Sequence, residues 1–265
     1  MPAVNPARLK ADIDELAGYL DDPSRLTRQV VSLLKFYADY TRRPGRATGV
    51  DDAPWVLHVP DPIIRELQRA LLRWLGDNPD QTREHSAALW AAGFRETQQI
   101  AAALLGEQKK EWVADWAEAR ARDCRDRPVL ADLAAVGLKG WRSSDANGYL
   151  KRAETWLGDR NTRMQAFALL ALAEVPLENC AQLPEVFDIL ERYSWEARGE
   201  TEKALRTLLQ RLAAASDRET AGFLLEQLAV RPEKITPFLA SLHPYFSERH
   251  IHLFELAVTG SGDTS

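Results

Sequence analysis

The chain has 265 residues, a net charge of −5 and a hydrophobic fraction of 45%. This composition is typical of a soluble, core-forming chain, long enough for one large domain or two small ones. The acidic balance counts against binding nucleic acid mainly through phosphates, although the local distribution of charge matters more than the total. The longest uncharged apolar run, at 166–173, is far too short to span a bilayer, so we expect no membrane contact.

The N-terminal half is predicted to be helical, with Gly and Pro between the helices. Asn5-Pro6, Asp61-Pro62 and Asn78-Pro79 each place a capping residue before a proline, which favours helix initiation. Gly93 and Gly106 are typical helix ends. The predicted helices span 7–20, 23–41, 63–75, 81–92 and 95–106, with a loop from about 43 to 59.

The C-terminal half continues as helix pairs joined by short loops. Pair starts recur at roughly 34–39 residues, which is the spacing of two-helix repeats. The TPR signature is absent, so the irregular spacing favours HEAT-like repeats. The predicted helices span 108–125, 128–138, 146–157, 161–174, 183–194, 197–214, 217–229, 233–243 and 247–258.

These patterns predict an all-α fold, namely a HEAT-like α–α superhelix (a right-handed solenoid) with a concave cleft. In such repeats the second helices line a concave surface, which is the usual binding site. We expect a single domain over 1–265. It comprises an N-terminal helical cap (1–50), helix-pair repeats (60–258) and a disordered tail (259–265).

The segment "EWVADWAEARARDC" at 111–124 holds the first candidate site. Trp112, Trp116, Ala119 and Asp123 follow the spacing i, i+4, i+7 and i+11 and share one face if this segment is helical. A buried, unpaired carboxylate is costly. The face is therefore either the wall of an active site or a buried helix edge with one acid at its margin. In the second case, Arg120 and Arg127 are within reach of Asp123 as ion-pair partners.

Other catalytic signals are absent from the sequence. There is no Gly-rich phosphate loop, G-x-S-x-G or H-E-x-x-H motif. His250 and His252 face different sides of a helix, and the two cysteines form no metal pattern. We expect no cofactor, no metal and a cytoplasmic protein with free thiols. The simplest role for the remaining tryptophans is core packing: Trp55, Trp74, Trp90, Trp141, Trp156 and Trp195.

Four segments resemble consecutive parts of the AlkD-type DNA alkylation repair glycosylases. They are "LHVPDPIIRELQRAL" (57–71), "ALWAAGFRETQQIAAALLG" (88–106), "WVADWAEARARDC" (112–124) and "RMQAFALLALA" (163–173). The resemblance covers roughly residues 50–230, and "LLKFYADYTRRPG" (33–45) is similar to the opening of a distinct branch. It implies a HEAT-like solenoid that removes N3- and N7-alkylated purines from duplex DNA.

The catalytic cleft of these enzymes uses a Trp-x-x-x-Asp helix, whose carboxylate stabilises the positive charge on the sugar as the base leaves. Matching Trp112 to a preceding tryptophan of the family implies that Asp123 is this carboxylate and that Ala119 replaces the catalytic tryptophan. The other register places Trp116 at that tryptophan, and Arg120 then replaces the aspartate. Neither register keeps both residues.

Two more cleft positions of the family are replaced here. The arginine that holds the DNA backbone falls at Gln165, and the second cleft tryptophan falls at Thr207. The resemblance thus implies a cleft lined by Trp112, Trp116, Ala119 and Thr207. The expected DNA contacts are Arg42, Arg43, Arg46, Arg163, Gln165, Lys203 and Arg206. The alternative for the basic residues is ordinary surface charge, offset on the 197–214 helix by Glu200 and Glu202.

Two functions stay open at this point. The first is a relative of alkylpurine glycosylases that binds duplex DNA in its concave cleft, with excision through Asp123 weak or lost. The second is a non-enzymatic scaffold whose concave face binds a protein partner. The resemblance favours the first, whereas the acidic net charge and the replaced cleft residues favour the second.

Overall fold

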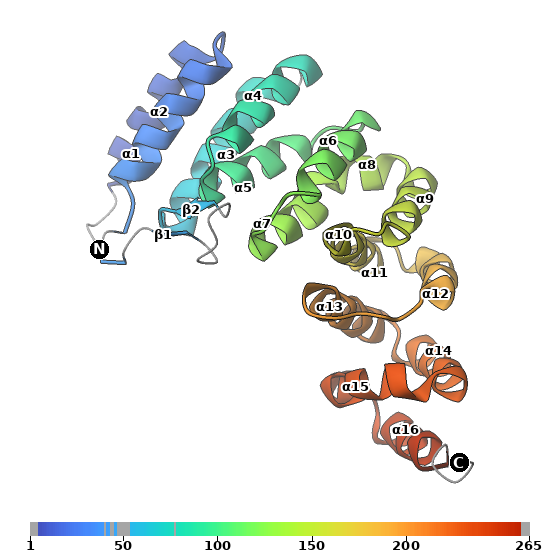
Figure 1. Cartoon of the computed structure of the whole chain (residues 1–265). Coiled ribbons are helices and arrows are strands. Elements are labelled where there is room, and N and C mark those ends of the chain that lie inside the picture. The colour runs from blue at the N-terminus through green and yellow to red at the C-terminus, as the bar shows by residue number, and fades with distance from the viewer. Residues whose placement is uncertain (1–4, 40, 43–44, 47–53, 77, 261–265) are drawn as a thin grey trace. The chain divides into compact units, whose positions relative to one another are not determined.

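The computed structural model is almost entirely helical (Figure 1), which confirms the prediction of an all-α fold. It describes residues 5–260 apart from 40, 43–44, 47–53 and 77. Within these ranges, the strands form one antiparallel pair of two residues each, β1 (Gly45–Arg46) and β2 (Trp55–Val56), and an isolated bridge joins Trp55 to Phe94. None of the described helices is long and apolar enough to cross a membrane.

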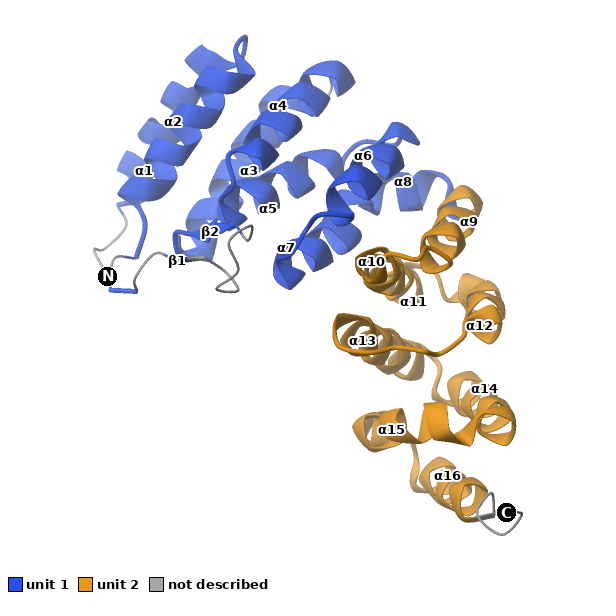
Figure 2. Cartoon of the chain, viewed as in Figure 1, with its two compact units in different colours: residues 1–146 blue, residues 147–265 orange. Residues whose placement is uncertain are grey.

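The chain divides into two compact units, residues 1–146 and 147–265 (Figure 2). The single domain, the solenoid and the concave cleft that the sequence suggests therefore stay predictions. Unit 1 contains α1 (Pro6–Asp14), η1 (Glu15–Tyr19), α2 (Pro23–Phe36), α3 (Asp61–Leu75), α4 (Pro79–Ala91), α5 (Arg95–Leu105), α6 (Trp112–Ala121), α7 (Arg127–Asp132), the π-helix η2 (Leu133–Gly137) and α8 (Lys139–Ser144).

Side-chain caps begin several of these helices, at the predicted Asn5 and Asn78 and also at Asp22, which is not among the predicted caps. Asn5, Asp22 and Asn78 each accept hydrogen bonds from backbone N–H groups in the first turn that follows. The predicted cap at Asp61 is wrong, because α3 already starts at that residue and follows Pro60. Asp61 instead contributes an acid to the first turn, where the helix dipole favours negative charge.

Helix α5 lies at the centre of unit 1 and packs against α3, α4, α7 and η2. Its apolar residues, including Ile100 and Leu104, are fully buried in a core shared with α2 and α3. Burial of this kind is the main source of stability in a helical unit. The polar side chains of the first turns of α5 are therefore held on a rigid element.

Unit 2 contains α9 (Ala146–Leu157, whose first residue belongs to unit 1), α10 (Thr162–Leu172), α11 (Val175–Glu178), η3 (Cys180–Gln182), α12 (Leu183–Arg192), α13 (Glu200–Ala215), α14 (Asp217–Val230), α15 (Pro232–Leu242), η4 (His243–Tyr245) and α16 (Glu248–Gly260). Helix α10 packs against α13, which in turn packs against α14 and α15. The buried Tyr149 hydroxyl donates a hydrogen bond of 2.8 Å to the Ala171 carbonyl and ties α9 to α10.

Several boundaries differ from the predicted ones. The helix predicted over 108–125 is the shorter α6, and the short helices α8 and α11 were not predicted. Part of the predicted tail is helical, since α16 extends to Gly260, whereas 261–265 lie outside the described residues. After α6 ends, the chain turns and brings Asp126 to α5.

Candidate functional site

A pocket of about 340 Å³ opens in unit 1 at the C-terminal end of α6. It brings Asp123 and Ala119 together with side chains from α4 and α5, which are far away in the sequence. Its lining residues are Pro54, Trp90, Gln98, Ala119, Arg120, Asp123, Cys124 and Arg125. The pocket thus combines a carboxylate, an indole, an amide and guanidinium groups in a small space.

Asp123 lies in the turn after α6, two residues beyond Ala121, so it does not continue the predicted helical face. Its side chain is exposed, and its carboxylate makes no hydrogen bond or ion pair with any other described residue. Neither Arg120 nor Arg127, the two partners that the spacing offers, pairs with it. The carboxylate is therefore free to meet a ligand.

The indole in the pocket wall belongs to Trp90, for which the sequence predicts core packing. Trp90 is half-buried and meets the buried Trp116 edge-on, with ring centroids 5.4 Å apart and an interplanar angle of 86°. Trp116 and the half-buried Trp112 do not line this pocket. No sequence signal distinguishes Trp90 from a core tryptophan, although the structure places it in the last turn of α4, shortly before the positive-φ Gly93.

Arg120 is the second charged group of the pocket. Its guanidinium lies 4.3 Å from the centroid of the Trp116 ring, and no acid among the described residues pairs with it. Burial lowers the pKa of Arg120 from its usual value, and the neighbouring Arg83 lowers this pKa further. The guanidinium stays charged at neutral pH because its ordinary pKa is so high. It offers several N–H donors to a ligand.

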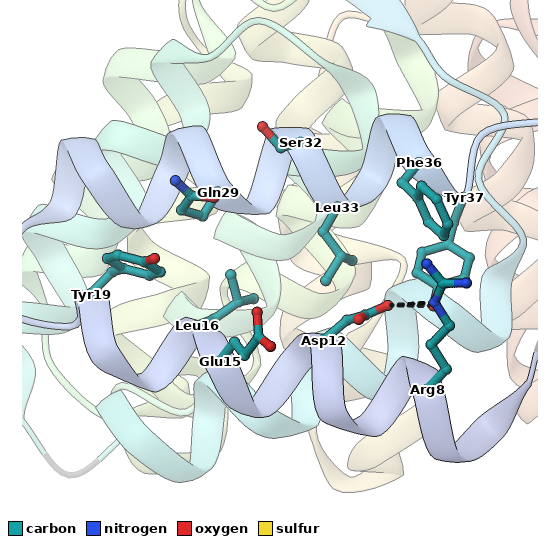
Figure 3. A pocket seen from close by; sticks show the side chains of 10 residues that line it. All are labelled: Arg8, Asp12, Glu15, Leu16, Tyr19, Gln29, Ser32, Leu33, Phe36 and Tyr37. Atoms are coloured by element: carbon teal, nitrogen blue, oxygen red, sulfur yellow. Dashed lines mark hydrogen bonds and ion pairs between the residues drawn. The ribbon is translucent and has the colours of Figure 1, made fainter.

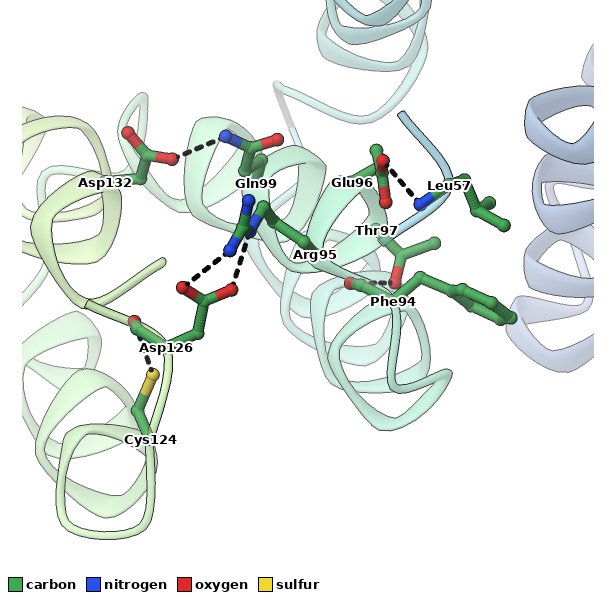
Figure 4. Close-up of polar contacts among 9 residues, drawn as sticks. All are labelled: Leu57, Phe94, Arg95, Glu96, Thr97, Gln99, Cys124, Asp126 and Asp132. Atoms are coloured by element: carbon green, nitrogen blue, oxygen red, sulfur yellow. Dashed lines mark hydrogen bonds and ion pairs between the residues drawn. The ribbon is translucent and has the colours of Figure 1, made fainter. Parts of the chain in front are cut away.

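A buried ion pair holds the turn that carries Asp123 (Figure 4). Arg95 Nε and an N–H of its terminal nitrogens donate to the two oxygens of Asp126 at 2.6 and 3.1 Å, and the Asp126 side chain is completely buried. The Cys124 thiol also donates to the Asp126 carbonyl oxygen at 3.4 Å. Bidentate pairs of this type fix geometry as well as charge, so the turn is anchored to the start of α5.

Two further contacts attach the segment before α3 to the start of α5 and to the loop that precedes it. The backbone N–H of Leu57 donates to the buried Glu96 carboxylate at 2.9 Å (Figure 4). The N–H of Trp55 donates to the carbonyl of Gly93, in the loop before α5, at 2.8 Å. These contacts place Pro54 at the pocket. The N-terminal end of α5 is thus the common support of the pocket walls.

The predicted DNA contacts on α13 are occupied by ion pairs. Lys203 Nζ lies 2.7 Å from Glu200, and Arg206 lies 3.1 Å from Glu202. Glu200 and Glu202 thus offset the charges of Lys203 and Arg206, as expected if these basic residues are ordinary surface charge. Thr207 donates its hydroxyl to the Lys203 carbonyl.

The remaining candidates are in different surroundings. Gln165 donates to the Asp159 carbonyl at 2.9 Å and lines a second pocket, of about 350 Å³, in unit 2. Arg163 is half-buried and pairs with no acid among the described residues. Arg42 is exposed, whereas Arg43 and the side chain of Arg46 lie outside the described part of the chain.

A further pocket, of about 220 Å³, lies between α1 and α2 (Figure 3). Its polar side chains pair with each other, since the Tyr37 hydroxyl donates to Asp12 at 2.8 Å and Arg8 lies 3.9 Å from the same carboxylate. Burial, together with the bond to Asp12, raises the pKa of Tyr37 to about 12. Among the described residues, no group of three His, Cys, Asp or Glu side chains could hold a metal ion.

The structure is thus that of an all-α protein in which a carboxylate, Asp123, and an indole, Trp90, line one pocket. The family model of the DNA alkylation repair enzymes matches residues 37–237, and the chain belongs to this family. The resemblance of the sequence segments is thereby confirmed. No match to the chain was found among curated proteins or among solved structures. Helices α1, η1 and α2 all lie before the matched residues.

Proposed function

We propose that this protein binds duplex DNA and that the pocket around Asp123 contacts the alkylated nucleotide, with weak excision of the base. Membership of the DNA alkylation repair enzyme family supports a function of this kind. The observation that carries the proposal is the free Asp123 carboxylate, which shares a pocket with the indole of Trp90.

The chemistry requires little from the protein beyond charge and position. An alkylated purine is already cationic and leaves as a neutral base, so positive charge develops on the sugar. A carboxylate fixed nearby stabilises that charge, and an aromatic wall excludes water. Ala119 cannot provide this wall, but Trp90 lies in the same pocket and supports the proposal that the indole now comes from α4.

A protein-binding scaffold without enzymatic activity is the second candidate. The net charge of −5 favours it, and so do the acidic partners of Lys203 and Arg206. Phosphate contacts by these two residues would require their ion pairs to open. The two candidates differ in whether binding to DNA is strong and depends on salt.

The test combines a gel-shift titration with an excision assay. Binding to duplex DNA should weaken steeply as salt rises, because phosphate contacts release counterions. Asp123→Asn should abolish release of methylated purines and leave DNA binding intact. Asp115→Asn is the matched control, since Asp115 is an exposed acid of α6 outside the pocket. Absence of DNA binding would favour the scaffold, and excision unchanged in Asp123→Asn would exclude this carboxylate from the chemistry.

A further inference from the structure

Two arginines of unit 1 lie over neighbouring indoles and have no acidic partner. The guanidinium of Arg83, on α4, lies 5.6 Å from the centroid of the Trp112 ring. That of Arg120, on α6, lies 4.3 Å from the centroid of the Trp116 ring. Neither guanidinium makes a hydrogen bond or ion pair with any other residue that the structure describes. The two side chains therefore present two positive charges that no carboxylate balances.

The two guanidinium groups lie close together because the rings beneath them do. Trp112 and Trp116 are four residues apart on α6, so their side chains lie on the same face, about 5–6 Å apart along the helix. Burial lowers the pKa of Arg120, and the charge of the neighbouring Arg83 lowers this pKa further. Cation–π attraction to the two rings holds both groups in place despite their repulsion. An anion between them would relieve the repulsion and gain contacts with both.

The arrangement of the donors suits a terminal phosphate. A guanidinium presents a planar fork of N–H groups that binds two oxygens of an anion at once. A carboxylate has only enough oxygens for one such fork, and a phosphate inside a DNA strand has two free oxygens and a single charge. A terminal phosphate has three free oxygens and a charge of about −1.5 to −2 at neutral pH. Two forks without acids therefore match a phosphomonoester best.

We propose that Arg83 and Arg120 bind a phosphomonoester where α4 meets α6. The phosphate then lies at the rim of the pocket that contains Asp123, because Arg120 also lines that pocket. The 5′ end of a DNA strand and a free nucleotide both carry this group, so the chemistry of recognition is the same for the two sources. The site does not require base excision, and it adds a ligand that the proposed function does not include.

Two binding measurements test the site with defined probes. Fluorescence anisotropy compares a short DNA duplex that has 5′-phosphate ends with the same duplex that has 5′-hydroxyl ends. Calorimetry compares adenosine monophosphate with adenosine. The phosphorylated member should bind about tenfold more tightly, which is the size of one charge-assisted interaction. A preference in the duplex pair alone identifies strand ends as the source of the phosphate, and one in the nucleotide pair alone identifies free nucleotides.

The same measurements separate this inference from the proposed function. Equal affinities within both pairs would overturn the phosphomonoester site and leave binding to duplex DNA intact. Binding of adenosine monophosphate without binding of either duplex would overturn the proposed function and support the site. Failure to bind any of the four probes would overturn both.

Three variants assign the preference to these side chains. Arg83→Gln and Arg120→Gln should each remove the preference for the phosphorylated probe, whereas Arg73→Gln should keep it. Arg73 is the matched control, since it is an exposed arginine of α3 that pairs with no acid among the described residues. An intact preference in both Arg83→Gln and Arg120→Gln would overturn the assignment. Arg83 is exposed, so Arg83→Gln tests the site even if Arg120→Gln does not fold.

Discussion

Arg95 and Asp126 form a bidentate ion pair between the first residue of α5 and the residue that precedes α7. The Asp126 side chain is completely buried, and that of Arg95 is 25% exposed. The pair connects segments 31 residues apart and encloses the turn with Asp123 and Cys124. A buried carboxylate depends strongly on its partner, so this pair is sensitive to change on either side.

Removal of one charge from this pair should destabilise unit 1. Asp126→Asn should lower the free energy of unfolding by about 3 kcal/mol, the lower end for a broken buried pair, because water can partly solvate Arg95. Chemical denaturation followed by circular dichroism measures the change. In the exposed pair Asp61–Arg65, whose atoms are 3.8 Å apart, Asp61→Asn should cost less than about 1 kcal/mol. Equal effects of both changes would contradict a special role of the buried pair.

Gly140 is predicted to tolerate no side chain. A Cβ atom there would lie 2.6 Å from the Gly106 carbonyl oxygen and 2.8 Å from that of Gln108, so backbone would have to move. Gly140→Ala should therefore destabilise the protein by about 1–3 kcal/mol. Gly18→Ala is the control, because nothing lies within 4 Å of its added Cβ, and it should be neutral or slightly stabilising. Thermal unfolding compares the two variants, and a neutral Gly140→Ala would refute the close approach.

Asp132 should make stability depend on pH. Burial raises the pKa of this carboxyl above its usual value of 3.8, while the hydrogen bond of 2.8 Å from Gln99 acts in the opposite direction. The folded protein then holds this proton more tightly than the unfolded chain. The contribution of Asp132 to stability therefore rises as the pH falls through the raised pKa toward 3.8.

The variant Asp132→Asn measures this effect. Its amide oxygen can still accept the hydrogen bond from Gln99, but it carries no charge. The variant should be more stable than the wild type at about pH 7, and this difference should shrink as the pH approaches about 4. Urea titrations across that range provide the measurement. If the difference in stability between the variant and the wild type stayed constant with pH, the pKa of the Asp132 carboxyl would not be raised.

The basic residues of unit 2 should contribute unequally to DNA binding. Arg163 has no acidic partner among the described residues, whereas Lys203 is already paired with Glu200. Arg163→Ala should weaken binding and reduce the slope of log K against log salt by about 1, as for a lost phosphate contact. Lys203→Ala should change the slope less. Gel shifts at several salt concentrations test this, and a larger effect of Lys203→Ala would reverse the assignment.

The residues that support the pocket explain why the candidate site was only partly predictable. Asp123 and Ala119 could be identified because the resemblance rests on local segments, and both line the pocket. Trp90 could not, because a half-buried tryptophan near a helix end has the same local pattern as a core tryptophan. Whether Lys203 is free or paired was likewise open until the rotamers of α13 were known.

The sequence by itself determined the all-α fold and most helix starts, because capping residues such as Asn5 and Asn78 act within one turn and the apolar periodicity is local. It also carried the membership of the DNA alkylation repair enzyme family. Only the tertiary structure decided that α6 ends at Ala121 and that Trp90, Gln98 and Asp123 share one pocket. Such contacts depend on how distant helices pack, and the buried Asp126 carboxylate needs its partner Arg95, which lies on another helix.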